Sequence, residues 1–163
     1  MKKLNLYIET SVFGFYYDED PRNLYKREAT IKLFDQIKEG LFNGYISDIV
    51  LRELLATSDL ELRENLRDLS NRMNVLPIHR EKDVEHLSNL YIKRGAIPPY
   101  KRDDAVHVAI VVINPEIDIL VSWNCKHIVN AHIKRNLKSL TEQEGYKFGF
   151  DISTPEEVVI YDI

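Results

Sequence analysis

Four polar side chains mark the ends or starts of apolar segments in this sequence. Glu9 ends the run LNLYI and Asn124 ends DILVSW, whereas Glu53 lies on a helical pattern that follows an extended one and Asp104 lies at the start of a buried helical pattern. The carboxyl ends of parallel strands and the helices after them share one edge of a sheet, so we expect these groups to converge there. Three carboxylates in one crevice repel one another unless they are protonated or bind a cation, and oxygen ligands suit Mg²⁺ or Mn²⁺.

Each of these residues also has an ordinary structural interpretation. Glu9 would be a surface residue in a loop, Glu53 an exposed residue of its helix, and Asn124 the cap of the helix that follows. Asp103 and Asp104 favour a helix N-terminus through the helix dipole, by about 0.3–1 kcal/mol each. The residues alone leave these alternatives open.

Other polar and aromatic residues near the four are more typical of a core than of a site. His107, one turn after Asp104, is typical of a hydrogen-bonded core histidine rather than of a ligand or a base. The neighbouring aromatic residues favour packing or a partner surface over a base-stacking platform; they are Phe13, Phe15, Tyr16, Tyr17 and Trp123.

The elements that must position the polar groups alternate along the chain. Apolar residues at near-helical spacing predict helices over 21–39, 60–70, 80–95, 105–113, 126–135 and 139–145. Short extended pieces predict strands over 4–8, 45–46, 74–78 and 118–124, with a further strand near the end of the chain. Strands separated by helices require parallel crossovers, which predicts an α/β sandwich with a small parallel sheet.

The composition limits the class of protein. A chain of 163 residues, 44% hydrophobic and 29% charged, fits a single domain over residues 1–163 with a substantial core. The single Cys125 excludes an internal disulfide, and no apolar run approaches the roughly 20 residues that cross a bilayer, so we expect a cytoplasmic protein with no membrane span. The net charge of −4 argues against binding nucleic acid with the whole surface, but an acidic catalytic cluster would itself lower the charge of a nuclease.

Four segments in order resemble the motifs of the PIN-domain family, which includes the VapC-type toxins of toxin–antitoxin pairs: LYIETSVFG, YISDIVLRELL, KRDDAVHVAIVV and DILVSWNCKHI. The resemblance covers nearly the whole chain. It implies a three-layer α/β sandwich with a central parallel sheet, an acidic pocket at the strand ends, and a Mg²⁺- or Mn²⁺-dependent endoribonuclease activity on RNA. It also implies an antitoxin protein and a second copy of the chain as partners.

The resemblance places the family's acids on this chain position by position. It implies Glu9, Glu53 and Asp104 as catalytic metal ligands, with Asn124 at the fourth catalytic position. Supporting roles fall on the hydroxyl residues of the same motifs and on the acid beside the third one: Thr10, Ser11, Ser122 and Asp103. On a helix of 3.6 residues per turn, the side chain of Asp103 points roughly 100° away from that of Asp104.

Two positions depart from the family pattern. The family usually has Asp where this chain has Glu9, and often has Asp where it has Asn124. A longer first side chain and an uncharged fourth one would hold a second metal ion poorly, so cleavage could be slow, dependent on Mn²⁺, or absent. In the last case the chain would be a PIN-like module that binds RNA or a protein. A phosphatase of the haloacid dehalogenase type does not fit, because its two Asp separated by one residue are missing after the first strand.

Overall fold

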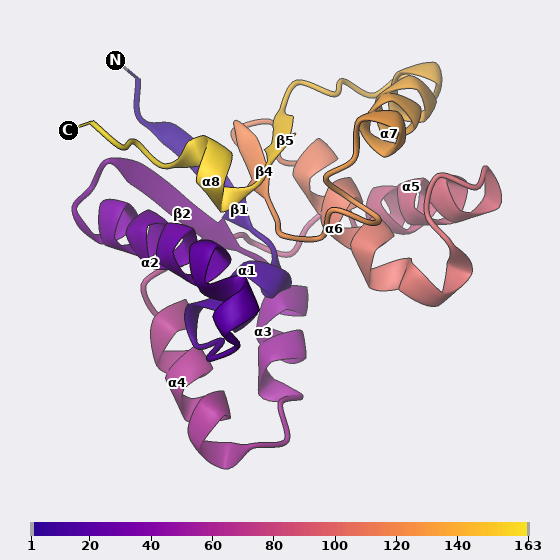
Figure 1. Cartoon of the computed structure of the whole chain (residues 1–163). Helices are drawn as coiled ribbons and strands as arrows, with labels where there is room; N and C mark the ends of the chain where they lie inside the picture. Colours follow the sequence, from indigo (N-terminus) through magenta and orange to yellow (C-terminus); the bar gives the residue numbers. More distant parts are fainter. Residues whose placement is uncertain (1, 163) are drawn as a thin grey trace.

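The computed structural model describes residues 2–162 and contains a five-stranded sheet whose neighbouring strands are all parallel (Figure 1). The strand order is β3–β2–β1–β4–β5, with β1 in the centre. The strands are β1 (Leu4–Ile8), β2 (Phe42–Ile46), β3 (Asn74–Val75), β4 (Ile119–Val121) and β5 (Asp151–Ser153). The α/β class predicted from the sequence is confirmed.

Helices cover both faces of this sheet (Figure 1). On one face pack α1 (Thr10–Tyr16), α2 (Leu24–Lys38), α4 (Leu60–Ser70) and the short α8 (Pro155–Val158). The other face is covered by α5 (Glu81–Lys93), α6 (Arg102–Val112) and α7 (Ala131–Gln143). The helix α3 (Asp48–Leu55) follows β2 and packs against α1 and α4. The chain is therefore a three-layer α/β sandwich.

The central strand β1 is buried between the two helical layers. Leu6, Tyr7 and Ile8 are 0% exposed, which is why this strand is a nearly continuous apolar run. The helix α6 is also deeply buried, as its sequence predicted, with Ala105 and Val108 fully inside. The only polar atom that this stretch of β1 brings into the core on a side chain is the Tyr7 hydroxyl, and a buried hydroxyl needs a hydrogen-bond partner.

The prediction of two helices over 126–135 and 139–145 is wrong. The structure has the single helix α7, which begins later and runs through both ranges. Asn130 fixes its start, because the side chain of this residue accepts a hydrogen bond from the backbone N–H of His132 (3.0 Å). Such a cap outweighs the helical spacing of the residues before it.

The residues between β4 and α7 form turns instead of a helix. The carbonyl of Asn124 accepts hydrogen bonds from the N–H groups of Ile128 (3.0 Å) and Val129 (2.8 Å). These turns hold the side chain of Asn124 beside the end of β4.

The other predicted helices are confirmed in position. The helix predicted over 60–70 coincides with α4, which Asp59 caps by accepting a hydrogen bond from the N–H of Leu62 (2.9 Å). The one predicted over 21–39 begins with the 3₁₀ turn η1 (Pro21–Asn23) and ends before Gly40, whose φ of +84° favours a residue without a Cβ. Within residues 2–162, none of the helices has the length and apolar character needed to span a membrane.

Candidate functional site

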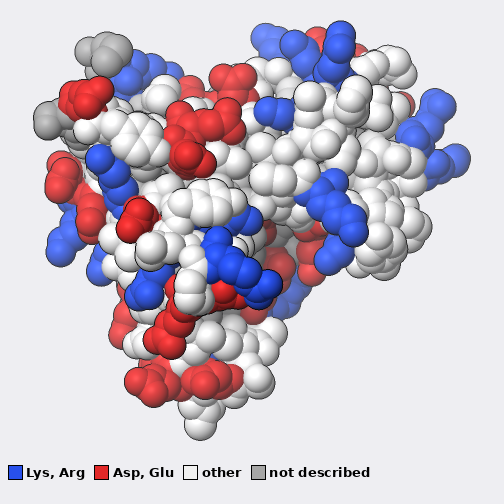
Figure 2. Space-filling view, viewed as in Figure 1, with Lys and Arg blue, Asp and Glu red and all other residues white. Residues whose placement is uncertain are grey.

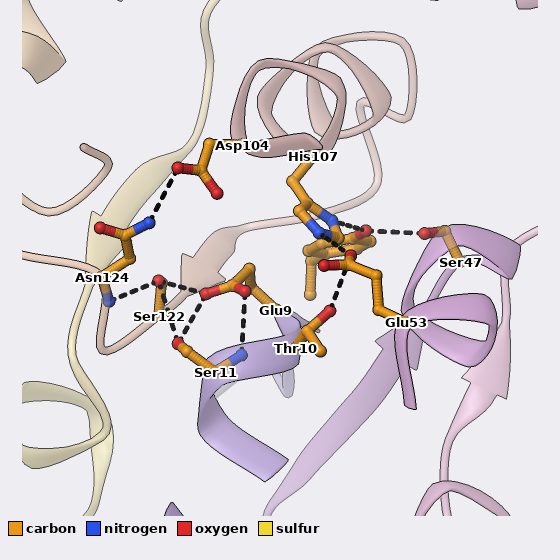
Figure 3. A network of polar contacts seen from close by, with 10 residues as sticks. Glu9, Thr10, Ser11, Ser47, Glu53, Asp104, His107, Ser122 and Asn124 are labelled. Carbon is orange, nitrogen blue, oxygen red and sulfur yellow. Dashed lines mark hydrogen bonds and ion pairs between the residues drawn. The ribbon is translucent and has the colours of Figure 1, made fainter. Parts of the chain in front are cut away.

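The carboxylate of Glu9 lies buried where β1 meets α1 (Figure 3), and the residue is only 5% exposed. Glu9 is the N-cap of α1, and its Oε2 accepts a hydrogen bond from the N–H of Ser11 (2.9 Å). Its Oε1 accepts the hydroxyls of Ser11 (2.6 Å) and Ser122 (2.5 Å). Three donors thus fix the orientation of one carboxylate at the end of the central strand.

The two serine hydroxyls are themselves oriented by the segment that follows β4. Ser11 Oγ accepts a hydrogen bond from the N–H of Trp123 (3.0 Å), and Ser122 Oγ accepts one from the N–H of Asn124 (2.9 Å). A hydroxyl that accepts from a backbone N–H directs its own hydrogen elsewhere, here to Glu9. The ends of β1 and β4 are therefore joined by side chains as well as by the sheet.

Asp104 approaches the same place from the first turn of α6, in the opposite helical layer (Figure 3). Its Oδ2 accepts a hydrogen bond from Nδ2 of Asn124 (3.0 Å), whose Oδ1 accepts one from the N–H of His127 (3.0 Å). Asn124 thus closes a turn, as a cap would, and also orients Asp104. The neighbouring Asp103 is exposed.

Figure 3 shows Asp104 facing Glu9 at this edge of the sheet, and the pKa of Asp104 responds to the charge of Glu9. Burial raises the pKa of the Asp104 carboxyl, and the negative charge of Glu9 raises it further. The hydrogen bond from Asn124 lowers this pKa but does not cancel the rise. Two carboxylates from different layers therefore repel each other at the carboxyl edge of the sheet.

Glu53 on α3 faces His107 rather than the other two acids (Figure 3). Its Oε1 lies 2.7 Å from Nε2 of His107 and accepts the hydroxyl of Thr10 (3.0 Å). Nδ1 of the same imidazole lies 2.7 Å from the hydroxyl of Tyr7, which lies 2.7 Å from that of Ser47. A buried chain of hydrogen bonds therefore connects α3, α6 and β1.

Burial and hydrogen bonding act in opposite directions on this pair. Burial lowers the pKa of His107, but the hydrogen bond to Glu53 and the charges of Glu9, Glu53 and Asp104 outweigh it and leave the pKa above its ordinary value. Burial raises the pKa of Glu53, but the hydrogen bond and charge of His107 and the Thr10 hydroxyl together bring it below its ordinary value. Both shifts favour an ion pair between the two side chains.

The donor chemistry of Glu9 and Asp104 suits a hard divalent cation. A positive charge between these carboxylates would remove the repulsion that raises the pKa of Asp104. Such cations often use one or two carboxylates and keep several waters. Among residues 2–162, however, no group of three or more His, Cys, Asp or Glu side chains is placed to hold a metal ion together. The three-carboxylate site that includes Glu53 stays a prediction.

Several residues around the carboxylates could be named from the sequence, and two could not. Thr10 contacts Glu53, and the predicted serines contact Glu9, as described above. His107 is fully buried and hydrogen-bonded, as expected of a core histidine. Tyr7 and Ser47 are site residues that the motifs did not reveal. The signal was the lone hydroxyl within the buried run LNLYI, since it had to find a partner inside the protein.

The aromatic residues close to the site pack, as the sequence predicted. The ring of Phe13 lies edge-on to Phe34 at a centroid distance of 5.2 Å, and both are fully buried. Trp123 is 6% exposed, and its Nε1–H donates a hydrogen bond to the hydroxyl of Thr30 (2.8 Å). These residues hold α1 and α2 against the segment after β4.

The surface over the strand ends is hollowed. Figure 2 shows Asp and Glu side chains inside a hollow near the centre of the visible face, with Lys and Arg side chains beside it. A separate cavity of about 290 Å³ lies between α3, α5 and α6, and its lining includes none of the three acids. Acidic and basic side chains therefore lie together around this hollow.

No protein-family model matches this sequence, and no curated protein does.

Proposed function

We propose that this chain is a metal-dependent endoribonuclease of the PIN-domain type. The observation that carries the proposal is the meeting of Glu9 and Asp104 at the carboxyl edge of a parallel sheet, where Ser122 contacts the first and Asn124 the second. Ligands of open α/β sheets bind at that edge. The order of the four PIN-like motifs along the chain supports the same family by resemblance.

In this proposal Glu9 and Asp104 hold Mg²⁺ or Mn²⁺. Glu53 is the third acid of the PIN-like set. It would bind the cation by giving up its hydrogen bond to His107. The chemistry that the cation supplies when bound is Lewis acidity, which lowers the pKa of a water molecule and offsets the charge of the phosphate.

The surrounding residues of the chain keep the carboxylates ready for this role. Ser11 and Ser122 hold Glu9 in one orientation through three hydrogen bonds. Asn124 engages one oxygen of Asp104 and leaves the other oxygen for a ligand; in Figure 3 that oxygen points toward Glu9. Catalysis needs no nucleophilic side chain, so Cys125 has no part in it.

The proposal extends to location and partners. RNA is the substrate, and the cytoplasm is the compartment where the chain would meet it. If the chain is the toxin of a toxin–antitoxin pair, a segment of the antitoxin should cover the site and present an Arg to Glu9 and Asp104, since a guanidinium pairs bidentately with carboxylates. A homodimer is the second proposed assembly.

A second candidate function is a PIN-like module that binds RNA or a protein without cleaving it. The observation that favours it is the Glu53–His107 pair, which engages the third carboxylate within the protein (2.7 Å between Oε1 and Nε2). Asn124 adds to this argument because an amide brings an oxygen but no charge.

The test compares two neighbouring aspartates. Asp104→Asn removes a charge with little change of shape and should abolish RNA cleavage in Mn²⁺ or Mg²⁺, whereas Asp103→Asn, at an exposed position of the same turn, should retain it. EDTA should stop cleavage by the natural protein. Equal losses in the two variants would contradict the role of Asp104. Calorimetry with Mn²⁺ completes the test, because cation or RNA binding without cleavage would favour the binding module.

A further inference from the structure

Two exposed tyrosines stand near the acidic site on opposite helical layers. Tyr25 lies in the first turn of α2 and is 55% exposed. Tyr100 lies in the 3₁₀ turn η2 (Pro99–Lys101), directly before α6, and is 74% exposed. Figure 1 shows α2 and α6 on the two sides of the sheet, with the end of β1 between them. Neither tyrosine has a role in the core.

Both rings rest against the same short segment, residues 122–127. The ring of Tyr25 lies edge-on to Trp123, with centroids 6.3 Å apart and planes at 86°. The ring of Tyr100 lies edge-on to His127, with centroids 6.1 Å apart and planes at 88°. This segment also supplies the side chains that contact Glu9 and Asp104. The positions of the two rings are therefore tied to that of the acidic site.

A lysine follows each tyrosine in the sequence. The ammonium group of Lys26 lies 6.0 Å from the centroid of the Tyr25 ring and 5.6 Å from that of Trp123. Lys101 follows Tyr100 in the sequence, in the same exposed 3₁₀ turn. An aromatic ring next to a cation is the combination with which proteins bind single-stranded nucleic acids, by stacking a base and contacting the adjacent phosphate.

We propose that Tyr25 and Tyr100 are base-stacking positions for nucleotides on the two sides of a phosphate seated at Glu9 and Asp104. The ligand is a single-stranded RNA segment, because a base paired within a duplex would first have to leave its pair and its stack to meet either ring. The identity of this ligand rests on the proposed ribonuclease function. The alternation of ring, acidic centre and ring, with Lys26 near one ring and Lys101 next to the other in the sequence, matches the alternation of bases and phosphates better than it matches a protein surface.

The single tryptophan of the chain makes this testable without any cleavage. Trp123 lies between Tyr25 and the site, so its fluorescence should report an oligonucleotide bound there. The protein is titrated in Ca²⁺, a hard cation that carboxylates bind and that offsets the charge of the phosphate, with an octauridylate, with an abasic oligonucleotide of the same length, and with a blunt RNA duplex; each oligonucleotide is checked to be intact afterwards. We expect the octauridylate to bind most tightly, because only its bases are free to stack.

Substitutions identify the rings. Tyr100→Ala should weaken octauridylate binding by about 5-fold or more, the smallest effect expected for one stacked base, and should leave binding of the abasic oligonucleotide unchanged. Tyr100→Phe keeps the ring and should restore binding. Tyr161→Ala is the matched control and should have no effect, since Tyr161 is also exposed (57%) and also lies near a lysine, Lys32 (5.0 Å), but on the C-terminal segment.

The results separate this inference from the proposed function. No binding of octauridylate, or equal losses for the base-bearing and abasic oligonucleotides in Tyr100→Ala, would overturn the inference. RNA cleavage that is insensitive to Tyr100→Ala and Tyr25→Ala would also overturn it while leaving the ribonuclease proposal intact. Binding that depends on the tyrosines in a protein that cleaves no RNA with either cation would refute the nuclease and support the stacking positions.

Discussion

Replacing Tyr7 by Phe should destabilise the protein by about 2 kcal/mol. The Tyr7 hydroxyl is buried and lies 2.7 Å from both Ser47 Oγ and His107 Nδ1, which are buried as well. Its removal leaves two buried polar atoms each lacking a partner, and an unsatisfied buried group costs about 1–3 kcal/mol. We use the lower end of this range, about 1 kcal/mol, for each of the two atoms. The reason is that the substitution also removes the Tyr7 hydroxyl, whose desolvation on folding costs free energy.

This free energy converts into a measurable shift of the melting temperature. With an unfolding entropy of roughly 2.1 cal/mol/K per residue, a chain of 163 residues should lose about 6 °C. Thermal and urea unfolding followed by circular dichroism would measure both quantities. Tyr100→Phe is the control, since it removes a hydroxyl from an exposed ring and should change the free energy of unfolding by less than about 0.5 kcal/mol.

A double-mutant cycle tests the network itself. Ser47→Ala alone leaves the Tyr7 hydroxyl bonded to His107, and it removes one of the two atoms that Tyr7→Phe would leave without a partner. The double variant should therefore be less destabilised than the sum of the single variants, by about 1 kcal/mol. Strict additivity, or a loss below about 0.5 kcal/mol for Tyr7→Phe, would refute the description of this hydroxyl as the shared partner.

Three further predictions concern the carboxylates. Asp104→Asn should raise the melting temperature in metal-free buffer at pH 7. The Asp104 carboxyl has a raised pKa in the folded protein, so it stabilises the fold at pH values below its ordinary pKa and loses that contribution as the pH rises through the folded pKa. The higher melting temperature of the variant should therefore vanish near pH 3, which parallel melts at the two pH values would measure. Ser122→Ala leaves Glu9 with two of its three donors and should weaken Mn²⁺ binding by about 10-fold in calorimetry, whereas unchanged affinity would show that the hydroxyl does not orient the ligand. The natural protein should cleave RNA faster with Mn²⁺ than with Mg²⁺, which demands near-ideal octahedral geometry; Glu9→Asp should narrow this gap in rate measurements, and loss of activity with both cations would mean that the pocket is built around glutamate.

The fold could be predicted from the sequence because its signals are local. The continuous apolar run of β1, the helix over 60–70 and the stop at Gly40 each depend on a few neighbouring residues. The prediction failed at α7 because two local signals conflict there. The residues from 126 onward have helical spacing, but Asn130 caps a helix that begins later and Asn124 closes turns before it.

The site could be predicted only in part, because some of its contacts join residues that are far apart in the sequence. The places of Glu9 and Asp104 follow from the topology of a parallel sheet and do not depend on which side chains surround them. The direction of Glu53 depends on His107, which is 54 residues away in the sequence, and that of His107 depends on Tyr7, which is 100 residues from His107. No pattern of neighbouring residues encodes such a chain of contacts.

The hydrogen bond between Ser122 and Glu9 joins residues that are 113 positions apart, and the pairing of β1 with β4 closes the same loop. Contacts of such high sequence separation form slowly, because the entropy of closing the loop is lost before the contact is gained. The helices and the pairing of β1 with β2 can form while the chain is still being synthesised. The carboxylate of Glu9, in contrast, acquires its partner from β4 only after three quarters of the chain exists, so the acidic site is among the last features to assemble and is missing from any nascent chain that stops before β4.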